Sequence, residues 1–197
     1  MAASLVKLYI MLAVFDGIEH GTITDDANVD ALLKQMITVS SNEAANGLLS
    51  RIGNGDGKAA IATVTAIAQR YGFTSSEELR TLTGMASGNA VENWTSTRDC
   101  GSFLSQVYAG TLVSKNASER MMQLLLGQTR RTKIPAGVPS GVKVANKTGE
   151  LAAVQNDVAI VFGTHPYVLA VMSSDISSAV APSQITELSR AVWDAAQ

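Results

Sequence analysis

Three short motifs contain the side chains of this sequence that could do covalent chemistry, and the first is Ser4-Leu5-Val6-Lys7. It opens an apolar pattern with helical spacing, so a helix would place Ser4 and Lys7 on one face, one turn apart. A serine hydroxyl is a weak nucleophile until a base takes its proton. A lysine can be that base when burial or nearby positive charge favours its neutral form. The pair therefore indicates acyl transfer through a serine, although the pattern S-x-x-K alone is a weak signal.

The second motif, Ser40-Ser41-Asn42, lies between two apolar helical runs. Serine and asparagine are preferred at helix N-caps, so the motif has a purely structural interpretation. The functional interpretation gives Ser40 a role in relaying a proton and Asn42 a contact with a substrate amide. The two interpretations are compatible, and this motif alone is also a weak signal.

The third motif, Lys147-Thr148-Gly149, is expected to end a strand. The Lys147 cation and the Thr148 hydroxyl both suit a substrate carboxylate. Gly149 would allow a close approach of another backbone segment. The backbone N–H of Glu150 would then be one oxyanion donor and that of Ser4 the other. The alternative is an ordinary exposed lysine on an edge strand.

Apolar spacing and turn residues predict a block of helices followed by a sheet. The expected helices are 3–19, 28–39, 42–52, about 58–71, about 97–109 and 114–126. Residues 74–93 are polar and irregular. The expected strands are 142–145, 154–162 and 167–172, followed by a helix from about 182 to 196. This order predicts an α+β fold.

Composition excludes several classes of function. Of the 197 residues, 46% are hydrophobic, 16% are charged and the net charge is −2, so the chain can bury a core but lacks the basic surface of a nucleic-acid-binding protein. The single cysteine, Cys100, excludes an internal disulfide and a cysteine-based zinc site. His20 and His165 are expected to be solvated loop residues. We therefore predict no metal, and no apolar run is long enough to span a membrane.

In their order, S-x-x-K, S-x-N and K-T-G are the motifs of class A β-lactamases and penicillin-binding proteins. The sequence resembles this penicillin-recognising serine hydrolase family over nearly its whole length. The resemblance implies that Ser4 is the acylated nucleophile, that Lys7 is its base, and that Ser40 passes a proton to the leaving nitrogen. The residues that would bind substrate are Asn42, Lys147, Thr148, Gly149 and Glu150.

The resemblance also implies a β-lactamase/transpeptidase-like fold with a single domain over 1–197. A helical lobe, about 20–135, and a sheet lobe, about 136–197 with helix 3–19, would hold the site between them. Small-molecule β-lactams or cell-wall peptides would be the substrates of a bacterial, extracytoplasmic enzyme linked to antibiotic resistance, with no cofactor. Two alternatives stay open: a D,D-peptidase-like penicillin-binding enzyme with slow deacylation, and a non-catalytic penicillin-binding or degenerate domain.

The sequence departs from the class A pattern where deacylation is concerned. Class A enzymes carry a glutamate in a Glu-x-x-Leu-Asn phrase that activates the deacylating water, and residues 79–94 lack this phrase. Glu77, Glu78 and Glu92 are the nearest carboxylates, and we expect all three to be solvated surface groups. Ser41 also stands where class A enzymes usually carry aspartate. Acylation with slow deacylation is therefore expected.

A second departure concerns the beginning of the sheet. The family fold has a helix and two strands before the nucleophile, whereas Ser4 lies three residues from the start of this sequence, which shows no signal peptide. We expect upstream sequence to be missing. The strand 167–172 would then have a bare apolar edge, which predicts pairing with an N-terminal fragment or self-association.

Overall fold

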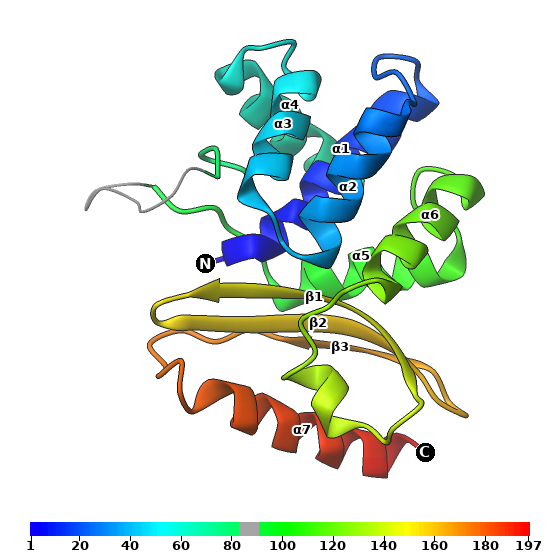
Figure 1. The fold of residues 1–197 in the computed structure, drawn as a ribbon, viewed down its shortest axis with the longest axis vertical. Helices are drawn as coiled ribbons and strands as arrows, with labels where there is room; N and C mark the ends of the chain where they lie inside the picture. Colours follow the sequence, from blue (N-terminus) through cyan, green and yellow to red (C-terminus); the bar gives the residue numbers. More distant parts are fainter. Residues whose placement is uncertain (83–90) are drawn as a thin grey trace.

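Helices and strands occupy separate layers in the computed structural model, which describes residues 1–82 and 91–197 (Figure 1). Part of the expected irregular segment 74–93, residues 83–90, lies outside the described residues. The helices above the sheet are α1 (Lys7–Glu19), α2 (Ala27–Thr38), α3 (Asn42–Ile52), α4 (Gly57–Arg70), α5 (Thr97–Ala109) and α6 (Lys115–Leu126). Helix α7 (Ala181–Ala196) covers the opposite face of the sheet, beside a short 3₁₀ turn, η2 (Ile134–Gly137). The predicted α+β class is confirmed.

The described residues form one antiparallel sheet in the order β1 (Lys143–Leu151), β2 (Val154–Phe162) and β3 (Tyr167–Val171). The predicted strand 142–145 is too short, because β1 stays paired with the mostly apolar β2 from Lys143↔Phe162 to Leu151↔Val154. Favourable pairing with β2 thus outweighs the modest strand propensity of the third motif. Lys147-Thr148-Gly149 consequently lies within β1 and does not end it.

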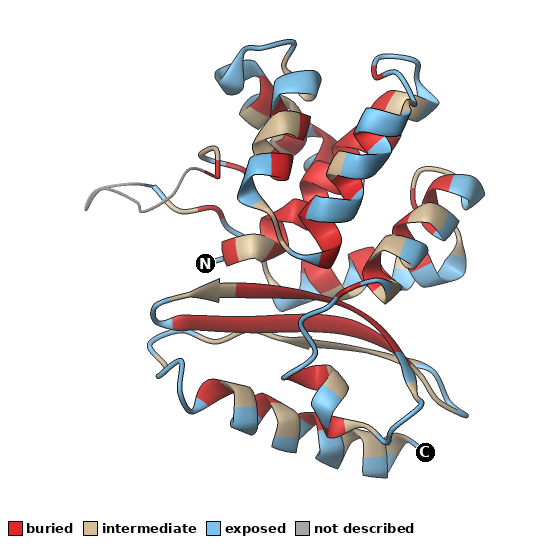
Figure 2. Cartoon of the chain, in the orientation of Figure 1, coloured by how far each residue is buried: buried red, intermediate tan, exposed pale blue. Residues whose placement is uncertain are grey.

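The helical layer is built around α1. Its residues from Lys7 to Gly17 are buried, and it packs against α2, α3 and α4 (Figure 2). We expected residues 3–19 to belong with the sheet lobe. In the structure a 3₁₀ turn, η1 (Ala3–Val6), contacts β1 and β2, and the α-helix begins at Lys7. The first motif therefore bridges the two layers.

Capping side chains fix where the helices begin. Ser41 accepts a hydrogen bond from the Ala44 N–H at 3.1 Å and is the N-cap of α3. The N-cap interpretation of the second motif thus holds for its middle residue. Ser40 lies just outside the helix with a φ of 61°, in the left-handed region that serines rarely adopt.

Within residues 1–82 and 91–197, no helix is both long and apolar enough to cross a membrane.

Candidate active site

The structure brings the first two motifs into direct contact through Lys7. Its Nζ lies 3.1 Å from Ser4 Oγ and 3.2 Å from Ser40 Oγ. It also lies 2.7 Å from the Ser40 carbonyl oxygen and 2.7 Å from Asn42 Oδ1. Lys7 is fully buried, whereas Ser4 is partly exposed. The hydroxyl that would be acylated is thus accessible, and the amine that would activate it is not.

The contacts of Lys7 suit a general base. An ammonium group has three N–H donors, whereas the four oxygens around Nζ could take up four. The Ser40 carbonyl and Asn42 Oδ1 can only accept, and they make the two shortest contacts. A neutral amine can donate to these two and accept a hydrogen bond from the Ser4 hydroxyl. That arrangement is the one in which the amine removes the serine proton.

The electrostatic surroundings favour the neutral form of Lys7. Burial is the largest cause that lowers the pKa of Lys7 to about 8, and the positive charge of Arg130 lowers it further, while Glu78 opposes the shift. About a tenth of Lys7 is therefore uncharged at pH 7, far more than for an ordinary lysine.

The third motif approaches the same cluster from β1. Lys147 is fully buried, and its Nζ donates to Ser40 Oγ at 2.9 Å and to the Thr148 carbonyl at 2.7 Å. Burial, followed by the charges of Lys7 and Arg130, holds the pKa of Lys147 well below its usual range. The alternative of an exposed edge-strand lysine is wrong. Ser40 Oγ lies between two amines, as a proton relay would require.

Gly149 fits the close approach that the sequence predicts. A Cβ at this position would lie 2.8 Å from the Ala2 carbonyl oxygen and 3.2 Å from the Leu5 backbone nitrogen. The absence of a side chain thus lets β1 pass directly beside η1. Ser4 and Glu150 lie next to this contact on the two segments, and their N–H groups remain the predicted oxyanion donors.

Hydrogen bonds hold the residues that precede Ser4. Asn156 Nδ2, on β2, donates to the carbonyls of Met1 and Ala2 at 3.2 Å and 3.3 Å. The Ala2 N–H donates to the Asn93 carbonyl at 2.8 Å. Ala3 has a φ of 49°, which is unfavourable for an alanine. The strained backbone next to the nucleophile is therefore fixed from the sheet and from the segment that precedes α5.

The remaining substrate-binding candidates lie around this cluster. Asn42 is exposed, and its Oδ1 accepts from Lys7, so its amide nitrogen is the group that could donate to a ligand. Thr148 is 2% exposed and pairs with Asp157 across the sheet. Among the described residues, no group of three or more His, Cys, Asp and Glu side chains could hold a metal ion.

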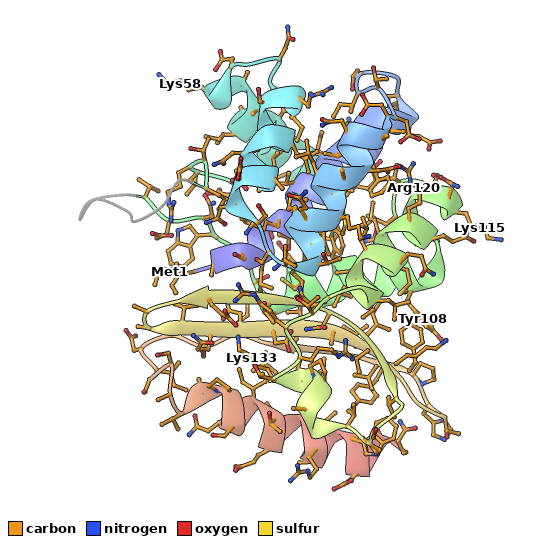
Figure 3. The ribbon with its side chains drawn as sticks, in the orientation of Figure 1. Met1, Lys58, Tyr108, Lys115, Arg120 and Lys133 are labelled. Atoms are coloured by element: carbon orange, nitrogen blue, oxygen red, sulfur yellow. The ribbon has the colours of Figure 1, made fainter. Side chains whose placement is uncertain are left out.

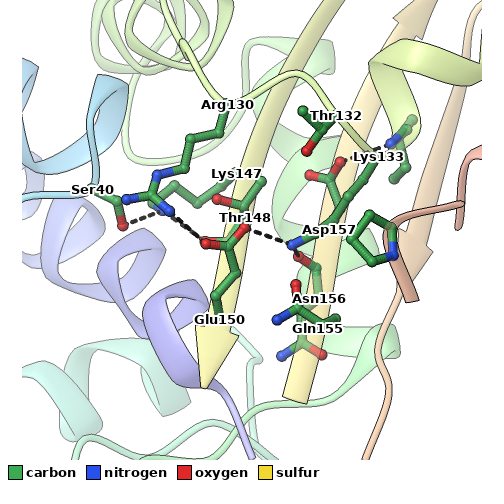
Figure 4. Close-up of polar contacts among 12 residues, drawn as sticks. Ser40, Arg130, Thr132, Lys133, Lys147, Thr148, Glu150, Gln155, Asn156 and Asp157 are labelled. Carbon is green, nitrogen blue, oxygen red and sulfur yellow. Dashed lines mark hydrogen bonds and ion pairs between the residues drawn. The ribbon is translucent and has the colours of Figure 1, made fainter. Parts of the chain in front are cut away.

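Sequence reasoning missed two cations beside the third motif. Arg130 and Lys133 precede η2, and both contact the carboxylate of Glu150 (Figure 4). Lys133 lies between the sheet and the α7 side of the molecule (Figure 3), and it is only 1% exposed. The cluster of basic residues at 130–133 was the available signal, but short surface runs of this kind are common.

Glu78 contradicts the expectation that it is a solvated carboxylate. It is 2% exposed, because the Thr65 hydroxyl binds both its N–H and its C=O and holds this segment against α4. Asn93 Nδ2 donates to Oε1 at 3.3 Å, and Oε2 has no partner among the described residues. Burial raises the pKa of Glu78 to about 8, against the opposing influence of Arg80, Asn93 and Lys7.

The other two glutamates are closer to expectation. Glu77 is exposed, whereas Glu92 is partly buried and forms an ion pair with Arg80 at 2.9 Å. Glu78 is therefore the one of the three that lies in a low-dielectric environment near Lys7.

The chain is similar to a known protein family and to several solved structures. A family model described as "Beta-lactamase enzyme family" matches residues 24–196. PBP-A is similar at 23% identity and a TM-score of 0.85, over 98% of this chain and 80% of that chain. The β-lactamase from Sphaerobacter thermophilus DSM 20745 is similar at 23% identity and a TM-score of 0.87, over 99% of this chain and 82% of that chain.

A third solved structure, the TLA-3 extended-spectrum β-lactamase, has 21% identity and a TM-score of 0.87, over 98% of this chain and 83% of that chain. No curated protein matches the chain. At these identities the structural matches demonstrate a shared fold. Ser4 and Lys7 lie before the segment that the family model matches, but the structural matches cover 98% of the chain or more.

The raised pKa of Glu78 makes stability depend on pH. Because the folded-state pKa of about 8 exceeds the ordinary 4.5, protonated Glu78 contributes stability below about pH 4.5, and this is lost as pH rises through 8. Urea unfolding at pH 5 and pH 9 should show a Glu78-dependent loss on the order of 4 kcal/mol. Glu78→Gln should flatten this loss, whereas Glu77→Gln should not. Equal pH dependence in wild type and Glu78→Gln would contradict the buried environment.

Proposed function

Because the chain belongs to the β-lactamase enzyme family, we propose that it is a serine hydrolase that forms an acyl-enzyme with β-lactams. The observation that carries this proposal is the contact of buried Lys7 Nζ with the hydroxyls of Ser4 and Ser40. A structurally similar PBP-A mutant was solved as an acyl-enzyme complex with penicillin G, at 22% identity. That neighbour supports a β-lactam as the ligand class.

In the proposed acylation, Ser4 Oγ attacks the lactam carbonyl carbon while Lys7 Nζ takes the hydroxyl proton. The N–H groups of Ser4 and Glu150 would stabilise the negative charge that develops on the carbonyl oxygen. The C–N bond of the lactam then breaks, and Ser40 passes the proton to the leaving nitrogen. Addition of water to the Ser4 ester and release of the acid would complete the cycle.

The second candidate, a penicillin-binding enzyme with slow deacylation, is favoured by the missing base. Among the described residues, no carboxylate forms a hydrogen bond with Ser4, Lys7 or Ser40. Residues 79–91 contain no aspartate or glutamate. Buried Glu78 bonds to Asn93, and its high pKa leaves it mostly protonated at neutral pH. We therefore propose that hydrolysis of the acyl-enzyme is the slow step. From the family resemblance we also propose cell-wall peptides as the natural substrate class and an extracytoplasmic location.

Intact mass and turnover, followed together, test this function. With benzylpenicillin, the wild-type chain should gain one covalent adduct, and a chromogenic cephalosporin should show a burst followed by slow steady-state hydrolysis. Ser4→Ala should abolish both signals, because it removes the attacking oxygen. Ser50→Ala, at an exposed position on α3, is the matched control and should leave both unchanged.

The outcomes separate the alternatives. Absence of both adduct and turnover in the wild type would support the non-catalytic domain and defeat the enzyme. Rapid turnover without an accumulating adduct would defeat slow deacylation while keeping the serine mechanism.

The open edge of β3 supports a further proposal about assembly. Within the described residues, β3 pairs only with β2, and all five of its side chains are half-buried and mostly apolar. Unpaired strand edges readily accept another strand. We propose that this edge pairs with a second molecule or with an upstream segment.

Light scattering across a concentration series tests self-association through this edge. The wild type should form a dimer at high concentration, and Leu169→Lys should shift it toward monomer by placing a charge on β3. Leu188→Lys, at a 46% exposed site on α7, is the matched control. A monomer with a well-ordered, solvent-exposed β3 edge, seen as rapid amide hydrogen exchange at 167–171, would contradict the proposal.

A further inference from the structure

The carboxylate of Glu150 lies between the cations Arg130 and Lys133, beside the third motif (Figure 4). Arg130 Nη1 donates to one of its oxygens, and Lys133 Nζ donates to the other at 2.8 Å. Burial tends to raise the pKa of Glu150, but the hydrogen bonds and charges of Lys133 and Arg130 outweigh it and hold the pKa below its ordinary value. Glu150 is therefore ionised at neutral pH.

This carboxylate shares a strand face with the hydroxyl expected to bind a substrate carboxylate. Thr148 and Glu150 are two residues apart on β1, so their side chains point to the same side of the sheet. Their partners on β2 are Asp157 and Gln155. An incoming carboxylate that reached Thr148 would therefore enter the field of Arg130 and Lys133, which already hold an anion.

Lys133 is fixed more firmly than the anion, whereas the side chain of Arg130 is 48% exposed. Lys133 is 1% exposed and also donates to the Asn156 carbonyl at 3.3 Å. Asp157, which is buried nearby, accepts hydrogen bonds from the Asn146 amide and the Ile134 N–H, both at 3.0 Å. The side chain of Glu150 is 32% exposed. It can rotate into solvent, whereas Lys133 would keep its positive charge in the site without its strongest partner.

We propose that Glu150 is a specificity-determining residue, an internal carboxylate that occupies the anion site of Arg130 and Lys133 and must be displaced by the carboxylate of a substrate. This inference rests on the proposed function for the identity of the substrate. It makes affinity for carboxylate-bearing ligands lower than the cations alone would give. It also predicts that neutralising Glu150 improves binding of the acid form of a ligand and leaves an uncharged ester unaffected.

Equilibrium binding in a Ser4→Ala background tests the proposal without requiring acylation. Benzylpenicillin and its methyl ester differ in the charge of one carboxyl group, and each is titrated by calorimetry into Ser4→Ala, Ser4→Ala/Glu150→Gln and Ser4→Ala/Glu187→Gln. Glu150→Gln should tighten binding of the acid by up to about fivefold, the range expected for release from a partly exposed ion pair. Glu187→Gln changes the net charge equally at an exposed site on α7 and should have no effect.

Weaker or unchanged binding of the acid in the Glu150→Gln variant would overturn the proposal, because Glu150 would then support the cations and not compete for them. An equal gain for the acid and the ester would also overturn it. A gain for the acid alone, together with a wild-type chain that forms no adduct, would keep the anion site and reject the serine hydrolase. Absence of acid binding in every variant would reject the anion site.

Discussion

The site depends on the burial of two lysine amines on either side of one serine hydroxyl. Lys7 and Lys147 both reach Ser40 Oγ, at 3.2 Å and 2.9 Å, and the charge of Lys7 helps to lower the pKa of Lys147. Two ammonium ions so close together in a low dielectric would repel strongly. The arrangement is stable when a proton is shared or lost. An amine kept partly neutral in this way would be able to accept the proton of the Ser4 hydroxyl.

The fold keeps the two amines close together by fixing the backbone on both sides of them. The backbone departs from ordinary conformations at Ala3 and Ser40, next to the nucleophile and at the relay. Such conformations persist only where their surroundings impose them. Asn156 holds the carbonyls before Ser4, and Gly149 lets β1 lie directly against the same turn. The two layers are therefore joined at the point where the chemistry would occur.

Much of this arrangement could be predicted from the sequence, because helical spacing and motif order are local properties. The pairing of Ser4 with Lys7 and the separation of helices from strands belong to that class. The full length of β1 could not be predicted in this way, because it depends on pairing with β2, which stabilises a run, Lys147-Thr148-Gly149, of low strand propensity. The burial of Glu78 and the position of Lys133 depend likewise on distant contacts, with Thr65 and Glu150, that no local pattern encodes.

The most direct test of the account is the ionisation of Lys7 itself. Lysine labelled with ¹³C at the ε carbon can be followed by NMR as pH is raised, and the Lys7 signal is the one that Lys7→Arg removes. This signal should titrate near pH 8, well below the ordinary 10.5. Titration at the ordinary value, with Lys7 fully charged at neutral pH, would contradict its role as the base that activates Ser4.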